Sequence, residues 1–116
     1  MDFKSDKAIY HQIADYVCER ILQNDWAVGE RIPSVREMGG NLAVNPNTVM
    51  RSYELLERNN IIFNQRGIGF SVAENAKEKI LLLFKNEFLE EEVPVFFKKM
   101  QLLGLTFKDI ERYEQK

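Results

Sequence analysis

Apolar and polar residues alternate along the start of the chain with the period of a helix. Between residues 8 and 23 the apolar side chains recur at spacings of three and four, which places them on one helical face. These residues are Ile9, Ile13, Tyr16, Val17 and Ile21. Gly29 in the stretch that follows marks a turn. The pattern predicts a first helix over residues 8–23 with one buried face.

Two short helices are predicted next, close together in the sequence. Ser34-Val35-Arg36-Glu37 has the form of a capping box, so the second helix is expected to begin at Ser34. This helix should be short, because Gly39-Gly40 are poor helix formers. Asn45 is a good N-cap and the proline after it suits the first helical position, which predicts a third helix over Pro46–Arg58. Only Leu42-Ala43-Val44 separate the two, as in a helix-turn-helix.

A β-hairpin is predicted after the third helix. Asn59-Asn60 should stop that helix, because asparagine tolerates the left-handed conformation needed there. Ile61-Ile62-Phe63 and Phe70-Ser71-Val72 are typical of two short strands, and residues 64–69 form the connection between them. A hairpin in this position is a wing. Its tip offers Arg66 between flexible residues and two glycines that allow a phosphate to approach the backbone.

The C-terminal third is predicted to be helical and to lack partners within the chain. A long helix is expected over residues 75–92, another from Pro94 to about Leu103, and a short one capped at Thr106. Apolar residues surround these helices on several sides: Leu82, Leu83, Val95, Phe96, Phe97, Met100, Leu102, Leu103 and Leu105. So little chain remains to cover them that a second copy is the economical partner. The dimerisation residues predicted on this basis are Leu81, Phe84, Phe88, Phe96, Phe97, Met100 and Leu103.

Length and composition fit this organisation. The chain has 116 residues, of which 45% are hydrophobic and 29% charged, enough for a packed core. The expected fold class is α+β, mostly α, with a winged helix-turn-helix DNA-binding domain in residues 1–74 and a helical dimerisation segment in residues 75–116. The single cysteine fits a reducing cytosol, and the longest apolar run, Ile80–Phe84, is far too short for a bilayer. A cytoplasmic protein without a membrane span is therefore expected.

The charge distribution is compatible with one surface that faces DNA. The formal charge of the whole chain is −2, but residues 31–72 hold five arginines against three glutamates and no lysine. Arginine presents a planar fork that suits phosphates and guanine edges. The local arginine excess favours nucleic acid only weakly by itself.

Enzyme chemistry is excluded by the inventory of side chains. His11 and Cys18 are the only histidine and cysteine, and in a helix seven residues span roughly 10 Å, too far for a nucleophile and its base. No pair of such residues has zinc spacing, and Glu90-Glu91-Glu92 is spread around a helix as a solvated face. The glycines near Arg66 lack the Gly-Lys-Ser/Thr end of a phosphate-binding loop. No catalytic or metal site is predicted.

Taken together, these segments resemble the GntR family of bacterial regulators, and in particular its small YtrA-like branch. The matching stretches are Tyr10-His11-Gln12-Ile13, Gly29–Met38, Val44–Val49, Arg51-Ser52-Tyr53 with Leu56, and Arg66–Phe70. The resemblance implies a winged helix followed by a short helical dimerisation segment, without the large ligand-binding domains of other branches. The roughly 40 residues after the winged helix are too few for the aminotransferase-like domain of one branch of the family, so no pyridoxal cofactor is expected.

Two positions depart from the usual pattern of this family. Gly39 stands where alanine is common, which should weaken the second helix by roughly 1 kcal/mol. Asn60 stands where glycine usually ends the third helix, and asparagine also enters the left-handed region. Neither departure argues against DNA binding.

The predicted DNA-contacting residues lie on the second and third helices and on the wing. They are Ser34, Arg36, Asn45, Asn47, Thr48, Arg51, Arg66, Gly67 and Gly69. Asn45 has an equally good alternative role as a plain helix cap, whereas capping does not require Asn47. The alternative for Arg51 is a surface ion pair with Glu54, and a plain hairpin turn would also need the glycines. Ile32, Val49, Tyr53, Leu55 and Leu56, with Tyr16, Cys18 and Trp26, are interpreted as core.

These observations predict a homodimeric repressor that recognises an inverted repeat in double-stranded DNA. A pocket between the C-terminal helices of two protomers can admit a small-molecule effector, although no cluster of polar residues identifies one; no other cofactor is expected. One alternative is a winged-helix module for protein assembly, with the third helix packed on a partner. Another is a DNA-compacting protein without sequence preference, which the low overall charge disfavours.

Overall fold

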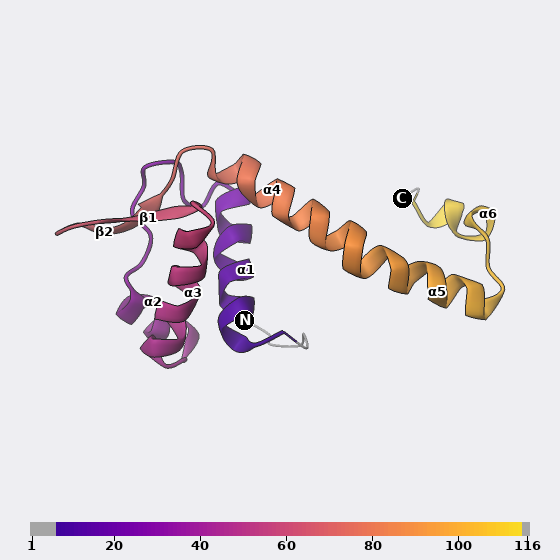
Figure 1. The fold of residues 1–116 in the computed structure, drawn as a ribbon, viewed down its shortest axis with the longest axis horizontal. Coiled ribbons are helices and arrows are strands. Elements are labelled where there is room, and N and C mark those ends of the chain that lie inside the picture. Colours follow the sequence, from indigo (N-terminus) through magenta and orange to yellow (C-terminus); the bar gives the residue numbers. More distant parts are fainter. Residues whose placement is uncertain (1–6, 115–116) are drawn as a thin grey trace. The chain divides into compact units, whose positions relative to one another are not determined.

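A computed structural model describes residues 7–114 (Figure 1). The chain forms two compact units, which divide between Leu81 and Leu82. The first unit contains three helices and a two-stranded antiparallel hairpin, and the second is helical. This is the mostly helical α+β class that the sequence predicts.

The first unit has the element order of a winged helix-turn-helix. Its elements are α1 (Ile9–Leu22), α2 (Val35–Leu42), α3 (Pro46–Arg58), β1 (Ile62–Gln65) and β2 (Gly69–Val72), followed by the start of α4 (Ala76–Glu87). In Figure 1, α3 lies beside both α1 and α2, and the hairpin extends away from the helices. The predicted bounds of the first and third helices are confirmed within one residue.

The core of this unit is built by the apolar faces of all its elements. Fully buried side chains come from each helix and from both strands: Ile13, Val17, Met38, Val49, Tyr53, Leu56, Ile62, Val72 and Ile80. Burying one large apolar side chain is worth about 1.5–3 kcal/mol, so these residues supply most of the stability. Tyr53 also donates its hydroxyl to the Pro33 carbonyl at 2.6 Å, and its ring meets Phe70 edge-on at 5.0 Å. Tyr53 thus ties α3 to the segment before α2 and to β2.

Four aromatic or apolar residues expected to be buried lie nearer the surface. Tyr16, Trp26 and Leu55 are half-buried, and Ile9, predicted on the buried face of the first helix, is 48% exposed. The guanidinium carbon of Arg20 lies 5.5 Å from the ring centre of Tyr16 and 6.0 Å from that of Trp26. Both rings therefore lie within cation–π distance of the Arg20 guanidinium, a contact that helical spacing does not reveal.

The predicted caps of the second and third helices are confirmed. The Ser34 hydroxyl oxygen accepts from the Glu37 N–H at 3.1 Å, and the Glu37 carboxylate accepts from the Ser34 N–H at 2.8 Å. The Asn45 side-chain oxygen accepts from the Asn47 N–H at 2.8 Å. The predicted turn needs one correction, because Leu42 is the last residue of α2 rather than part of the turn. The helix ends at Ala43, which adopts the left-handed conformation with a φ of 56°.

Close packing explains the glycine at position 39, which helix propensity alone does not. A Cβ atom added to this buried glycine would lie 2.9 Å from the carbonyl oxygen of Val44 and 3.4 Å from Cγ of Pro46. Val44 lies in the connection between α2 and α3, and Pro46 is the first residue of α3. Glycine lets the turn and α3 approach α2 closely, a packing gain that opposes the loss of helix propensity expected at this position.

Alanine should have opposite effects at the two adjacent glycines of α2. Gly40 has open space around the position of a Cβ, so Gly40→Ala should stabilise the fold by about 0.5–1 kcal/mol through helix propensity. Gly39→Ala gains the same propensity but must push backbone apart, so it should destabilise the fold by about 1 kcal/mol. Thermal and urea denaturation of the two variants beside the wild type measure the difference. Equal stabilisation by both substitutions would contradict the close packing at Gly39.

The wing is shorter at its tip and longer in its strands than predicted. Ile62 pairs with Val72 and Gln65 with Gly69, so the connection contains only residues 66–68 instead of 64–69. The polar Asn64 and Gln65 belong to β1 and are exposed. Their polar composition did not predict a strand, because β1 is extended here by backbone pairing with β2 and not by burial of side chains.

The second unit consists of helices with an unusual turn. After α4 come a π-helical turn η1 (Phe88–Glu92), α5 (Val93–Leu103), α6 (Phe107–Ile110) and a short 3₁₀ turn η2 (Glu111–Tyr113). Pro94 lies in the first turn of α5, which runs to Leu103 as predicted, and η1 joins α4 to α5 without a break in the helical backbone. The long helix predicted over residues 75–92 is divided, because α4 ends at Glu87 and η1 continues to Glu92. In a regular helix the Pro94 ring would clash with the carbonyl four residues earlier, and the wider π turn lies at that place. Gly104 ends α5 as predicted, with a φ of 68°.

Candidate nucleic-acid interface

The outer face of α3 is formed by polar residues at helical spacing. Asn47, Arg51, Glu54 and Arg58 recur every three or four residues and are exposed, whereas Val49, Ser52, Tyr53 and Leu56 on the opposite face are buried. Met50 lies beside the exposed row with 40% of its surface accessible. Of the predicted contacts, Asn47 and Arg51 therefore share one solvent-facing stripe, and the sequence did not single out Met50 and Glu54 beside them.

The two asparagines at the start of α3 have different environments. Asn45 uses its side-chain oxygen to cap the helix. The side chain of Asn47 is exposed and makes no hydrogen bond within residues 7–114, where only its backbone N–H donates to the cap. The half-buried Thr48 donates its backbone N–H to the Asn45 carbonyl at 2.9 Å. Asn47 is thus the more available of the two asparagines for a ligand.

Arg51 is held by an aromatic ring rather than by an acid. Its guanidinium carbon lies 4.1 Å from the centre of the Tyr10 ring in the first turn of α1. Among the described residues it makes no ion pair with Glu54, which was the alternative role for this arginine. Its charge is therefore not neutralised by a neighbouring carboxylate in the described part of the chain.

Two further arginines predicted to contact DNA are exposed. Arg36 lies in the first turn of α2 and Arg66 at the tip of the wing, and neither has a hydrogen-bond or ion-pair partner among residues 7–114. Gly67 has a φ of 82° at the third position of the tight turn closed by the Ile68 N–H and the Gln65 carbonyl, 2.9 Å apart. This turn requires glycine there, so the turn by itself accounts for Gly67.

Arg31 is a fourth arginine that sequence reasoning did not select. Its backbone forms an isolated β-bridge with Ser71 of β2, at the base of the wing. One guanidinium nitrogen lies 3.7 Å from the Glu37 carboxylate, and Nε lies 3.3 Å from where a Cβ on Gly69 would stand. The free face of Gly69, predicted to admit a phosphate, is therefore next to Arg31. The sequence did not single out Arg31, because residues 29–32 have the composition of a loop.

Glu37 is a carboxylate that lies beside Arg31. The hydrogen bond from the Ser34 N–H lowers the pKa of the Glu37 carboxyl group, the Ser34 side chain lowers it further, and Arg31 acts in the same direction. The carboxylate thus stays ionised at neutral pH and draws Arg31 toward the start of α2. The capping box and the arginine at the base of the wing are electrostatically linked.

Nucleophilic and metal chemistry find no support in the described residues. Burial raises the pKa of the Cys18 thiol to about 12, so it is protonated at neutral pH. Residues 7–114 contain no cluster of histidine, cysteine, aspartate or glutamate able to hold a metal ion. No helix in that range is long and apolar enough to cross a membrane.

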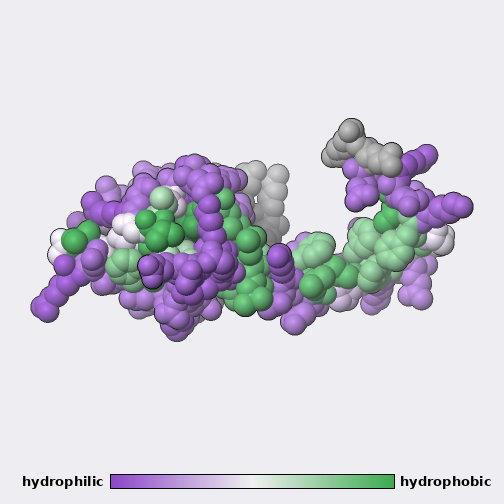
Figure 2. All heavy atoms as spheres, turned by 90° about the horizontal axis from the view of Figure 1, so that it is seen from above, coloured by the Kyte–Doolittle hydropathy of each residue, from purple (hydrophilic) through white to green (hydrophobic). Residues whose placement is uncertain are grey.

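The second unit carries most of the exposed apolar surface. Its large side chains on α4, η1, α5 and α6 that are at least 40% exposed include Leu82, Phe88, Leu89, Val95, Phe96, Phe97, Leu102, Leu103 and Phe107. Leu81, the last residue of the first unit, is also 43% exposed. Figure 2 shows green and pale green side chains gathered over these helices. Phe84 is half-buried, and Met100 is 8% exposed within the single chain.

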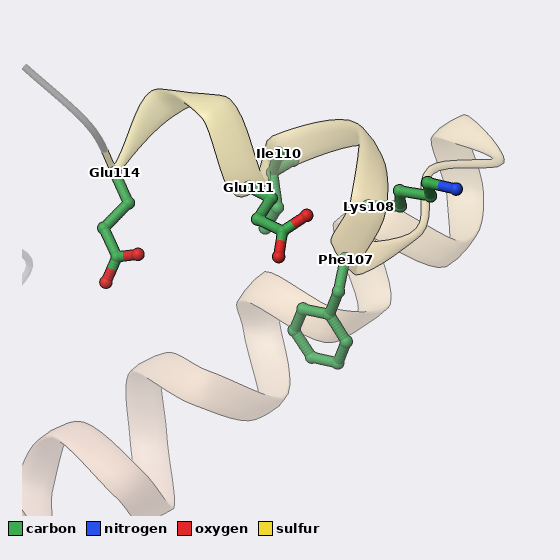
Figure 3. A pocket seen from close by; sticks show the side chains of 5 residues that line it. All are labelled: Phe107, Lys108, Ile110, Glu111 and Glu114. Carbon is green, nitrogen blue, oxygen red and sulfur yellow. The ribbon is translucent and has the colours of Figure 1, made fainter.

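A shallow hollow of about 470 Å³ lies against α6 and η2. Phe107 and Ile110 supply its apolar part, and Lys108, Glu111 and Glu114 supply charged groups (Figure 3). Phe107 points toward α5, where its ring meets Phe97 edge-on at 5.5 Å. The hollow belongs to the same exposed apolar region of the second unit.

The fold and this surface define a class of protein. A helix-turn-helix whose second helix presents asparagine and arginine to solvent, followed by a two-stranded wing with an arginine at its tip, is a winged-helix DNA-binding domain.

Comparison with known proteins agrees with this class. The family described as "Bacterial regulatory proteins, gntR family" matches residues 9–72. The uncharacterized HTH-type transcriptional regulator YhcF of Bacillus subtilis is 40% identical over 108 residues, which cover 93% of this chain and 88% of YhcF. The HTH-type transcriptional repressor YtrA of the same organism is 40% identical over 81 residues, covering 70% of this chain and 62% of YtrA.

A solved structure shows the same similarity in three dimensions. The putative GntR-family transcriptional regulator from Bacteroides thetaiotaomicron is 50% identical, with a TM-score of 0.76, and the match covers 93% of this chain and 95% of that one. The chain belongs to the GntR family and is a DNA-binding transcriptional regulator, not an enzyme. The predicted family, fold class and general function are thereby confirmed.

Proposed function

We propose that this regulator is a homodimeric repressor that binds an inverted-repeat operator. Each protomer reads one half-site with α3 in the major groove, and the wing contacts the flanking backbone. The outer face of α3 carries this proposal, because it offers Asn47 and Arg51 to solvent while the opposite face is buried. Asparagine suits adenine and arginine suits guanine in the major groove.

Around α3, the other predicted contacts are assigned to the sugar-phosphate backbone. Ser34 and Arg36 at the start of α2, and Asn45 and Thr48 at the start of α3, lie at helix N-termini, where free N–H groups and the helix dipole favour a phosphate. Arg66, with Gly67 and Gly69 beside it, contacts phosphate or the minor groove from the wing.

The exposed apolar surface of the second unit supports the homodimer. In the single chain Phe88, Phe96, Phe97 and Leu103 of this unit are 46–65% exposed, and Leu81 at the end of the first unit is 43% exposed. An apolar region of this extent marks an interaction surface, and a second copy covers it in a closed, symmetric arrangement. Phe84 and Met100, which the sequence also assigned to the dimer, are already partly or mostly covered by their own chain.

Repression is supported by a relative. The YtrA protein that is 40% identical to this chain is described as a transcriptional repressor. A dimer with two-fold symmetry reads two half-sites whose centres are about one helical turn, roughly 34 Å, apart. Because a bacterial regulator acts on the chromosome, we place the protein in the cytoplasm.

A binding titration tests the proposed operator. The wild-type chain first selects duplexes from a randomised library, and the selected duplex is then titrated at two salt concentrations beside a scrambled duplex. We expect an inverted repeat to be selected, with binding that is sequence-dependent and weaker at the higher salt concentration. Equal, weak binding to both duplexes would reject the proposal and favour a module for protein assembly.

A further inference from the structure

The first turn of α1 is fixed against the outer part of α3. The buried Ser52 hydroxyl contacts the Tyr10 carbonyl at 2.6 Å and the Thr48 carbonyl at 3.1 Å. The carbonyl of Tyr10, 42 positions earlier in the chain, is thereby held beside the helix that is proposed to read DNA. The Tyr10 residue as a whole is half-buried.

The ring of Tyr10 supports the guanidinium of Arg51 from one face. The distance of 4.1 Å from the guanidinium carbon to the ring centre is well inside the range of a cation–π contact. A cation–π contact holds the guanidinium through its charge and not through hydrogen bonds, so it leaves the N–H donors unused. An ion pair with a carboxylate would instead occupy those donors. Tyr10 therefore holds Arg51 without using the groups that bind a base or phosphate.

We propose that Tyr10 is a positioning residue for operator recognition, which holds the guanidinium of Arg51 ready for the major groove. The inference rests on the proposed contact between Arg51 and the operator. A long arginine side chain held in one orientation before binding loses less conformational freedom on binding, so its contribution to affinity and specificity is greater. The Tyr10 hydroxyl has no hydrogen bond within residues 7–114, so the ring carries this role.

A double-mutant cycle on the full chain tests this role. Wild type, Tyr10→Leu, Arg51→Ala and the double variant are titrated by fluorescence anisotropy against the duplex selected by the wild type. Arg51→Ala should weaken binding roughly 5- to 150-fold and Tyr10→Leu roughly 2- to 5-fold. The double variant should bind like Arg51→Ala, because the ring acts through the arginine. Tyr10→Phe keeps the ring and should bind within about twofold of wild type.

Base substitutions in the duplex separate positioning from a general structural role. The same variants are titrated against duplexes in which each half-site base pair is replaced symmetrically. Tyr10→Leu should relax discrimination at the base pair at which Arg51→Ala relaxes it. Thermal denaturation confirms that each variant is folded at the temperature of the titration.

Four results would overturn the inference. The first is a double variant whose loss of affinity is the product of the two single losses, and the second is a Tyr10→Leu loss of affinity that is equal on every duplex. The third is a Tyr10→Phe loss of affinity as large as that of Tyr10→Leu, and the fourth is wild-type affinity in Arg51→Ala. The proposed function fails differently, because wild type itself would then not distinguish the selected from the scrambled duplex.

Discussion

A chain truncated after Leu81 should fold, remain monomeric and bind the selected duplex at least ~100-fold more weakly than the full chain. The shortened protein keeps the whole first unit, including Ala76 and Ile80 of α4, which are fully buried. It lacks the whole second unit, including the exposed Phe88 and Phe96, and keeps only Leu81 of the proposed dimer residues. Two linked half-site contacts typically exceed a single contact by about 10²- to 10⁴-fold, and this advantage is lost in a monomer.

Size-exclusion chromatography with light scattering measures the oligomeric state, and anisotropy measures the affinity. A second truncation, after Glu74, is the matched control for folding. It also removes Ala76 and Ile80, and loss of a buried isoleucine alone costs about 2–5 kcal/mol. Only the shorter protein should therefore lose thermal stability. A dimer formed by residues 1–81 would reject the assignment of the dimer interface to the second unit.

Asn47→Ala should weaken binding to the selected duplex roughly 5- to 150-fold and leave stability within about 0.5 kcal/mol of wild type. The exposed Asn47 side chain has no hydrogen bond within residues 7–114, so its loss disturbs nothing in the described fold. If it pairs with an adenine edge, discrimination at one base pair should be relaxed in the variant.

Asn45→Ala is the matched control, because it removes the same side chain two residues earlier. The Asn45 oxygen accepts the Asn47 N–H at 2.8 Å, so its loss should destabilise the fold by about 1 kcal/mol. For a domain of this size that corresponds to a decrease in Tm of about 4–8 °C. Its discrimination between base pairs should be unchanged. Wild-type affinity and specificity in Asn47→Ala would remove this residue from the proposed interface.

Local sequence signals predicted the parts of the fold that depend on neighbouring residues. The caps at Ser34 and Asn45 were predictable because each cap bond joins residues two or three positions apart. The left-handed ends at Asn60 and Gly104 depend only on which residues tolerate a positive φ. The opposite faces of α3 follow from helical spacing alone, so the solvent position of Asn47 and Arg51 was also available from the sequence.

Features that depend on contacts between distant segments were not predictable in this way. The stacking of Arg51 on Tyr10 and the approach of Arg31 to Gly69 join separate elements. The close packing around Gly39 arises only when the turn folds back onto α2, so helix propensity alone did not reveal it. The strands of the wing were longer than composition indicated, because backbone pairing holds Asn64 and Gln65 without burying them.

The sequence by itself therefore determined the order of the helices and strands, the two helix caps and the family, because these follow from short-range hydrogen bonding, side-chain periodicity and recognisable motifs. Only the tertiary structure decided how the arginines are held. Tyr10 stacks beneath Arg51 and Glu37 attracts Arg31, while Arg36 and Arg66 have no partner among the described residues. Such differences depend on side chains brought together by packing, whose distances no local pattern encodes.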